Sequence, residues 1–354
     1  MTITLLVFST AALGLDPGPQ AASVQAAAIE FTVQSGHTSE IQGLEYASDG
    51  KFFVTAGKDS TIKLWSPTGT LIRTIRTGFW PNYLALSHDN QLLLVASRIG
   101  TIVLLTLEGH VVHRFPYVPP SEGYISAVAL SEDNHQVALG TTRGLILYRL
   151  DGTAETRVQL IGDNSGEVES VLCAPDGRLV SGYFDGKMRF WSPEGKLLRT
   201  ISAHEYAVKT LTLSPDGKTL ASAGSAIFFD KVPKGMRPVT KLWDLEGNPF
   251  GQFPSQFTQC LRFSVDGSNL VSGGLSDNEV HIYTRSGELL RTIKVGDGPR
   301  RSPYLIALAP DGQTLVTADD NIDPSGLEIW NVDGRFERAL LGLSGPMKNV
   351  VTSP

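Results

Sequence analysis

The feature that most constrains this chain is a short turn that recurs at nearly constant spacing. Each copy is an Asp-Gly or Asp-Asn pair, and successive copies stand 40 to 50 residues apart. Both kinds of pair tolerate the positive φ angles of a tight hairpin, so each copy predicts one. The seven copies are Asp49-Gly50, Asp89-Asn90, Asp133-Asn134, Asp176-Gly177, Asp216-Gly217, Asp266-Gly267 and Asp311-Gly312.

A second landmark recurs in the same phase and pairs a glycine with a large side chain. The glycines, which we expect to close the next hairpin of each unit, are Gly69, Gly109, Gly152, Gly195, Gly247, Gly287 and Gly334. Four residues before each of them stand Trp65, Leu105, Tyr148, Trp191, Trp243, Tyr283 and Trp330. An aromatic residue at a fixed place in every repeat suits the packing of one twisted sheet on the next.

The segment that follows several of these glycines is nearly identical between repeats. Residues 71–75, 197–201 and 289–293 read Leu-Ile-Arg-Thr-Ile or Leu-Leu-Arg-Thr-Ile, and each is predicted to be an outer strand. A period of this length with several short strands per unit is typical of a β-propeller. We therefore predict an all-β fold, a seven-bladed β-propeller of four-stranded antiparallel blades.

The two ends of the chain leave the closure of the ring open. We expect an N-terminal segment at 1–27, the propeller at 28–342, and a C-terminal tail or partial repeat at 343–354. Residues 28–33 alternate like a strand that completes the last blade, but residues 336–341 also have the pattern of its outer strand. A third alternative is an irregular eighth blade built from both termini.

Composition and charge bear on partners and compartment. The 354 residues carry a net charge of −6 without a basic stripe, so we predict no nucleic-acid partner. No apolar run is long enough to span a bilayer, and we expect a monomeric, cytoplasmic propeller. Export is the alternative if residues 1–26 act as a signal peptide, although no basic residue precedes Lys51. Cys173 and Cys260, the only cysteines, are expected to be reduced.

Two segments give a resemblance to a known family. Residues 214–224 (Ser-Pro-Asp-Gly-Lys-Thr-Leu-Ala-Ser-Ala-Gly) and 240–244 (Thr-Lys-Leu-Trp-Asp) resemble WD40 repeats of the bacterial style, and the resemblance covers roughly residues 36 to 342. It implies a buried His, Ser/Thr, Asp and Trp tetrad in a blade. The best match is His37, Thr55, Asp59 and Trp65; partial matches are Ser181, Asp185 and Trp191, and His204, Ser222 and Trp243. The resemblance makes these residues, with Trp330, structural rather than catalytic.

The resemblance also implies that partners bind the face on which the first strand of each blade begins, the top face. Aligning the first strands gives one ring at Glu40, Trp80, Tyr124, Glu167, Ala207, Phe257 and Ser302. A second ring lies two residues further, at Gln42, Asn82, Ser126, Glu169, Lys209, Gln259 and Tyr304. We predict that Trp80, Tyr124, Phe257 and Tyr304 contact a partner. The alternative for Trp80 is that it plugs a degenerate second blade together with Phe79.

Two loops of the top face add candidates. An insertion at residues 225–239 carries Phe228, Phe229 and Arg237, which are predicted to bind a partner or, alternatively, to pack on their own blade. The acidic segment that begins at Asp319 and Asp320 lacks the full ligand run of a calcium loop, so we expect a solvated turn and no metal site.

Motifs for catalysis are missing from the sequence. We find no phosphate loop, zinc-binding run or nucleophile elbow, and we predict no cofactor. The predicted function is a non-catalytic scaffold that binds a protein or peptide through its top face. The alternatives are a hydrolase with its site in the channel, for which only Glu40, Glu167 and Glu169 offer carboxylates, or one propeller of a larger multidomain protein.

Overall fold

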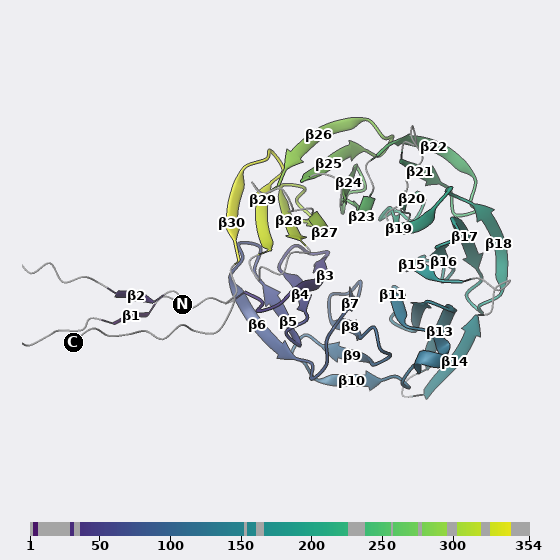
Figure 1. The fold of residues 1–354 in the computed structure, drawn as a ribbon, viewed down its shortest axis with the longest axis horizontal. Coiled ribbons are helices and arrows are strands. Elements are labelled where there is room, and N and C mark those ends of the chain that lie inside the picture. The colour runs from purple at the N-terminus through teal and green to yellow at the C-terminus, as the bar shows by residue number, and fades with distance from the viewer. Residues whose placement is uncertain are drawn as a thin grey trace, which may run out of the picture.

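Seven four-stranded antiparallel sheets form a closed ring in the computed structural model (Figure 1). The structure describes residues 3–5, 29–31, 36–151, 154–160, 166–225, 238–255, 258–274, 278–295, 303–319 and 326–340. Within each sheet the strands follow the order of the chain from the channel to the rim. The predicted fold, a seven-bladed propeller with four-stranded blades, is confirmed.

The first four blades occupy the N-terminal half of the ring. Blade 1 is β3 (Ile41–Tyr46), β4 (Phe53–Gly57), β5 (Thr61–Trp65) and β6 (Leu71–Arg76); blade 2 is β7 (Tyr83–Leu86), β8 (Leu92–Ala96), β9 (Ile102–Thr106) and β10 (Val111–Arg114). Blade 3 is β11 (Ile125–Leu130), β12 (Gln136–Thr141), β13 (Gly144–Asp151) and β14 (Ala154–Leu160), preceded by the short 3₁₀ helix η1 (Pro120–Glu122). Blade 4 is β15 (Val168–Cys173), β16 (Leu179–Tyr183), β17 (Lys187–Trp191) and β18 (Leu197–Ser202).

The last three blades complete the ring. Blade 5 is β19 (Ala207–Leu213), β20 (Leu220–Ser225), β21 (Val239–Trp243) and β22 (Pro249–Pro254). Blade 6 is β23 (Thr258–Phe263), β24 (Asn269–Gly274), β25 (Glu279–Thr284) and β26 (Leu289–Lys294). Blade 7 is β27 (Pro303–Leu308), β28 (Thr314–Asp319), β29 (Leu327–Asn331) and β30 (Phe336–Ala339).

The ring closes between blade 7 and blade 1, where β27 packs against β3. Blade 7 takes its outer strand from β30, so the alternative in which residues 28–33 complete this blade is wrong. Instead β2 (Ile29–Phe31) pairs with β1 (Ile3–Leu5) in a separate two-stranded sheet. The ring has seven blades, and the alternative of an irregular eighth blade built from both termini is wrong. The tail at 343–354 lies outside the described residues.

The recurrent turns have the geometry that their sequence predicts. The second residue of the pair has positive φ in all seven, including 57° at Asn90 and 63° at Asn134. The aspartate stabilises the turn through its side chain, because Asp89 Oδ1 accepts the Gln91 amide at 3.1 Å. The same arrangement recurs where Asp133 accepts the His135 amide at 2.9 Å. Each hairpin is thus fixed locally, before any blade packs on another.

The seven residues of the aromatic column are buried between blades. Trp65, Leu105, Tyr148, Trp191, Trp243, Tyr283 and Trp330 each expose 7% or less. One core cluster joins blades 1 and 7, since it contains Phe53 and Trp65 together with Val316 and Ile329. Corresponding clusters fill the other seams between neighbouring blades, so the core is a ring that surrounds the channel.

Polar clasps join neighbouring blades at the bottom face, which is formed by the turns between first and second and between third and fourth strands. Every seam has at least one. Asn90 donates to Ser48 Oγ (2.8 Å), Asn134 to Asp89, Arg149 to Pro193 O, Arg199 to Asn248, Arg285 to Asp216, Arg291 to Val332 O and Arg338 to Thr68 O. Arg199 and Arg291 belong to the repeated outer-strand motif, which explains the arginine in that motif.

Candidate functional site

A β-bulge in the first strand of six of the seven blades turns one side chain toward the channel. In six blades the pairing between first and second strands skips one residue, for example between Ile41 and Gly43 in blade 1. The skipped residues are Gln42, Ser126, Glu169, Lys209, Gln259 and Tyr304. A bulge residue leaves the ladder and its side chain is re-aimed. In blade 2, Asn82 holds the corresponding place directly before β7.

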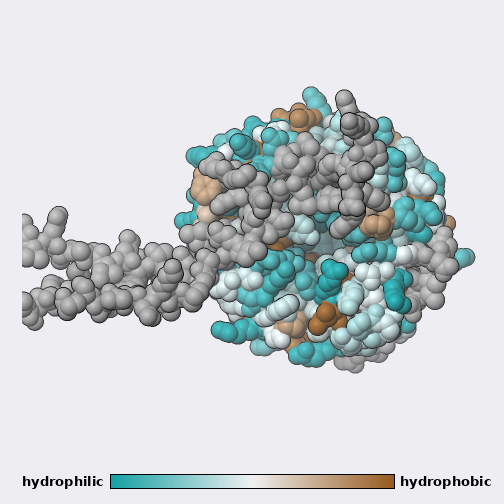
Figure 2. All heavy atoms as spheres, viewed as in Figure 1, coloured by the Kyte–Doolittle hydropathy of each residue, from teal (hydrophilic) through white to brown (hydrophobic). Residues whose placement is uncertain are grey.

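These seven residues are the second ring that the sequence alignment predicts, and all of them line one cavity of about 330 Å³ at the centre of the propeller. Figure 2 shows this hollow with hydrophilic residues around it. Arg98, Glu45 and Arg262 also contribute to its wall. The alignment therefore found the ring, whereas the bulge that directs it into the channel has no signature in the sequence.

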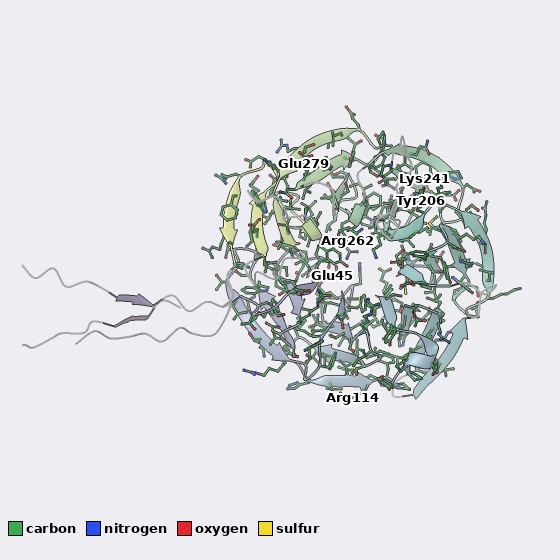
Figure 3. All side chains as sticks on the ribbon, in the orientation of Figure 1. Glu45, Arg114, Tyr206, Lys241, Arg262 and Glu279 are labelled. Atoms are coloured by element: carbon green, nitrogen blue, oxygen red, sulfur yellow. The ribbon has the colours of Figure 1, made fainter. Side chains whose placement is uncertain are left out.

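The carboxylates within the channel are paired with cations. Glu45 Oε1 lies 2.7 Å from Arg262 Nη2, and Figure 3 shows both at the inner wall. Burial raises the pKa of Glu45, an effect that Arg262 opposes. Glu169 Oε2 lies 2.7 Å from Lys209 Nζ. Two carboxylates that are each neutralised by a cation from another blade fit a structural and recognition role better than acid–base chemistry.

Glu167 differs from the other carboxylates at the channel mouth. Its side chain is half-buried and makes no hydrogen bond or ion pair within the described part of the chain. Burial, followed by the negative charge of Glu169, raises the pKa of Glu167, while Lys209 and Arg98 lower it. Glu167 thus lies directly before β15, where charges of both signs act on it.

The hydrogen bonds around the channel engage both donors and acceptors of the ring, since Asn82 Oδ1 accepts the Arg98 amide at 2.9 Å. Gln42 uses its amide group to donate to Glu40 (3.4 Å), and Gln259 uses its amide to donate to Ser225 Oγ (3.3 Å). Ser126 donates its hydroxyl to the Val168 carbonyl. The amide oxygens of both glutamines remain as acceptors at the channel wall.

Five large apolar or aromatic side chains are exposed in the top-face loops of blades 2 to 4. They are Trp80 (65% exposed), Ile99 (60%), Tyr117 (54%), Tyr124 (43%) and Phe184 (36%). Figure 2 shows a hydrophobic patch over blade 2. The other exposed large apolar residues lie on outer strands, except Val265 in a bottom turn. Exposed apolar residues that recur in the loops of one face are typical of an interaction site.

The sequence left two interpretations of Trp80 open, and the structure separates it from its neighbour. Phe79 packs against the core cluster of blades 1 and 2, beside residues such as Val54 and Val95. Trp80 is mostly exposed. Phe79 therefore packs into the second blade, whereas Trp80 does not.

Tyr124 is held in place by its own blade and by blade 2. Its amide donates to Thr142 Oγ1 (3.0 Å), and the next amide, of Ile125, donates to the Arg98 carbonyl (2.9 Å). The Arg98 guanidinium carbon lies 5.8 Å from the centre of the Tyr124 ring. Such a fixed aromatic side chain loses little freedom when it binds a partner.

The other predicted partner-binding residues have different positions. Tyr304 is half-buried and lines the channel instead of standing on the rim. Phe228, Phe229, Arg237 and Phe257 lie outside the described residues, as does the acidic segment from Asp320 onward. The sequence did not single out Ile99, Tyr117 or Phe184; their places in the loops of the same blades were the available signal.

The tetrad of blade 1 is assembled as the resemblance implies. His37 bonds Thr55 Oγ1 through Nε2 (2.7 Å) and Asp59 through Nδ1 (3.0 Å), and Trp65 donates to Thr55 (2.8 Å). Burial by itself would raise the pKa of Asp59, but the hydrogen bond and charge of His37 hold that pKa well below its ordinary value.

The other blades keep parts of this network. In blade 5, His204 and Trp243 both bond Ser222 Oγ at 2.8 Å. Burial, with the Lys241 ammonium second, lowers the pKa of His204 to about 4. In blade 4, Trp191 donates to Ser181 (2.8 Å). Trp330 in blade 7 is buried, and its indole nitrogen has no hydrogen-bond partner within the described residues.

Metal and membrane sites are not found in the part of the chain that the structure describes. It contains no group of three or more His, Cys, Asp or Glu side chains that could hold a metal ion. No helix in the described ranges is long and apolar enough to cross a membrane. Cys173 and Cys260 are both free, and burial raises the pKa of Cys173 to about 12.

Comparison with known proteins identifies the repeats. The family model for the WD domain, G-beta repeat, matches residues 30–66, 155–192, 195–229 and 249–284. The chain is 26% identical over 287 residues to autophagy-related protein 16 of Arabidopsis thaliana, covering 78% of this chain and 53% of that protein. It is 24% identical to a guanine nucleotide-binding protein subunit beta of the same plant, covering 84% and 82%.

A solved structure shows the same fold. The crystal structure of the Myceliophteria thermophila Cps50 (Swd1) β-propeller domain superposes with a TM-score of 0.67 at 17% identity, covering 85% of this chain and 98% of that one. Against autophagy-related protein 16 and the WDS homolog of Arabidopsis thaliana, the chain spans about half of the relative's length. This chain is a seven-bladed β-propeller, and four of its segments match the WD40 repeat model.

Proposed function

We propose that the protein is a non-catalytic scaffold that binds a protein or peptide through the top face of its propeller. The observation that carries this proposal is the set of exposed side chains in the top-face loops of blades 2 to 4, Trp80 and Tyr124 among them. Aromatic residues that are fixed by the backbone contribute large contact areas at small entropic cost.

The relatives support a role in assemblies. The subunit beta of a guanine nucleotide-binding protein is, by its name, one component of a complex. We transfer to this chain only the general role of contacting other proteins. The bacterial style of the repeats, the cytoplasmic location, the monomeric state and membership of a longer multidomain protein remain predictions.

The channel favours binding over hydrolysis. A hydrolase would need carboxylates that converge on one point, but Glu45 pairs with Arg262 and Glu169 pairs with Lys209. The rest of the ring is composed of Gln, Asn, Ser and Tyr side chains. This lining offers hydrogen bonds for recognition, and no general acid and base facing each other.

Affinity capture from a lysate of the source cells tests the proposal. The wild-type protein is compared with a Trp80→Ala/Tyr124→Ala variant. The matched control is Ile72→Ala/Leu198→Ala, which removes two side chains of similar exposure (56% and 52%) from outer strands. We expect partners that the control retains and the top-face variant loses. Partners captured equally by all three proteins would contradict the proposal.

A further inference from the structure

We infer that the ion pair between Glu45 and Arg262 is a clamp that holds blade 7 in the ring, and that blade 7 opens as one unit when the pair is broken. The inference is independent of the proposed function, because it concerns how the ring stays closed. Glu45 Oε1 in blade 1 lies 2.7 Å from Arg262 Nη2 in blade 6, so the pair spans the blade between them (Figure 3).

The seam between blade 7 and blade 1 differs from the other six seams. At those, the chain runs from the outer strand of one blade to the first strand of the next, as residues 203–206 do between β18 and β19. Blade 7 is built from β27 to β30 and blade 1 from β3 to β6, so neither contributes a strand to the other. The described residues therefore close the ring by contacts between two complete blades.

Strand pairing places Glu45 and Arg262 at equivalent positions of their first strands, with Ala307 of blade 7 between them. The three residues pair with Val54, Val271 and Val316 of the second strands. The same position in blades 2 to 5 is uncharged, as Ala85, Ala129, Leu172 and Thr212. Of these seven positions, the two that carry charge have opposite signs and flank blade 7.

The small side chain of Ala307 allows this contact. It ends at Cβ, so the long Arg262 side chain can reach past blade 7 to the carboxylate. Burial raises the pKa of Glu45 and Arg262 opposes that effect, while the charge of Glu45 raises the pKa of Arg262. Each charge therefore stabilises the other inside the channel, and the removal of one leaves its partner without a counter-charge.

The remaining contacts of blade 7 with blade 1 lie deeper in the blades and at the bottom face. They include the core cluster that contains Phe53 and Ile329, and the bond from Arg338 to the Thr68 carbonyl at 3.1 Å. A supersecondary unit held in this way can open without global unfolding. Because blade 7 is one such unit, loss of the clamp should expose the seams on both of its sides.

The two native cysteines provide a local probe of this opening. Cys260 is buried, and its Sγ lies 3.6 Å from the Ile306 carbonyl oxygen of blade 7. Cys173 packs instead against the core cluster of blades 3 and 4. The experiment is labelling with iodoacetamide, with mass spectrometry of each cysteine over time. In Arg262→Met, Cys260 should be labelled at least about tenfold faster than in the wild type, and Cys173 at the wild-type rate.

Arg262→Met also separates opening from a direct electrostatic effect on the thiol. Burial raises the pKa of Cys260, and the Arg262 guanidinium opposes this effect. Removal of the guanidinium without opening would therefore make the thiol less reactive and slow its labelling. Unchanged or slower labelling of Cys260 would overturn the inference. Equal acceleration at both cysteines would overturn it too, because it would show global destabilisation.

Two further variants complete the test. Glu169→Gln is the matched control, because it breaks an ion pair of the same length, 2.7 Å, between the adjacent blades 4 and 5. It should not speed the labelling of Cys260, and acceleration there would contradict a specific clamp. Glu45→Gln/Arg262→Met removes both charges and should still label Cys260 faster than the wild type. A wild-type rate in this double variant would assign the opening to an unpaired charge and overturn the inference.

Discussion

The two faces of the propeller are built from the same repeats but use their polar and aromatic side chains differently. On the bottom face each seam is closed by a side chain of one blade that bonds a turn of the next, as Arg285 does with Asp216. On the top face, Trp80 and Tyr124 are exposed, and neither fills a seam between blades. The polar groups of the bottom face stabilise the ring by joining neighbouring blades. The aromatic side chains of the top face remain exposed to solvent, where a partner can contact them.

The difference follows from how regular the connections on each face are. Bottom turns are tight Asp-Gly or Asp-Asn hairpins whose conformation is fixed by the turn itself, so their neighbours can rely on them as anchors. Top-face connections vary in length, from residues 142–143 between β12 and β13 to residues 115–124 between β10 and β11, and carry side chains that no repeat pattern dictates. A rigid ring with variable loops on one face separates stability from recognition.

The largest expected effect contrasts two tryptophans. Trp65→Ala removes a fully buried side chain between blades 1 and 7 and should lower the free energy of unfolding by about 3–5 kcal/mol. Trp80→Ala should change it by less than about 0.5 kcal/mol, because that side chain is 65% exposed. Urea unfolding measures both. A large loss of stability in Trp80→Ala would show that Trp80 stabilises the fold as Trp65 does, and would contradict the proposed difference between the two faces.

The second prediction concerns His204, which lies in a top-face loop but has a structural role, because it bonds Ser222 Oγ. Its folded-state pKa of about 4 is below the unfolded value of about 6.5, so the unfolded chain takes up the proton first. Stability should therefore fall as the pH drops from about 6.5 toward 4, by up to about 3 kcal/mol.

The substitution that tests the role of His204 is His204→Asn. Unfolding measured across this pH range should show a smaller pH dependence for His204→Asn than for the wild type. His110→Asn, which changes an exposed histidine, is the control and should keep the wild-type dependence. The account of His204 fails if the two variants behave alike.

A smaller effect is expected when a bottom clasp is broken. Arg285→Ala removes two bonds to Asp216, at 2.9 and 3.1 Å, and the bonds to Thr219, and should lower the free energy of unfolding by about 1 kcal/mol. Arg143→Ala removes an exposed arginine from a top-face loop and should have almost no effect. Chemical denaturation of the two variants compares the faces directly. Equal losses of stability would contradict the claim that the bottom-face side chains stabilise the ring and the top-face ones do not.

Most of the fold could be predicted because its determinants are local and repeated. An Asp-Gly turn fixes a hairpin without help from the rest of the chain, and the column from Trp65 to Trp330 gives each blade its packing residue. The ring of channel residues followed from the same alignment. What could not be predicted depends on contacts between distant segments: Glu45 and Arg262 are 217 positions apart and meet because the ring closes.

The closure of the ring and the roles of the exposed residues could not be predicted from the sequence for other reasons. Two segments, 28–33 and 336–341, have the alternation of a strand, and pairing with β29 decided between them. Phe79 and Trp80 are adjacent and similar in character, so only the packing of Phe79 into the core distinguishes them. The bulges depend on how first and second strands pair, which the composition of the strands does not encode.

Hydrogen exchange of the propeller, free and bound to a captured partner, tests the central claim most directly. The account predicts slower exchange in the bound state for residues 77–82, 97–101 and 115–124 of the top face. Residues 48–51, 88–91 and 131–135, in the bottom turns, should exchange equally in both states. Protection of the bottom turns with no change in the top-face loops would contradict the claim.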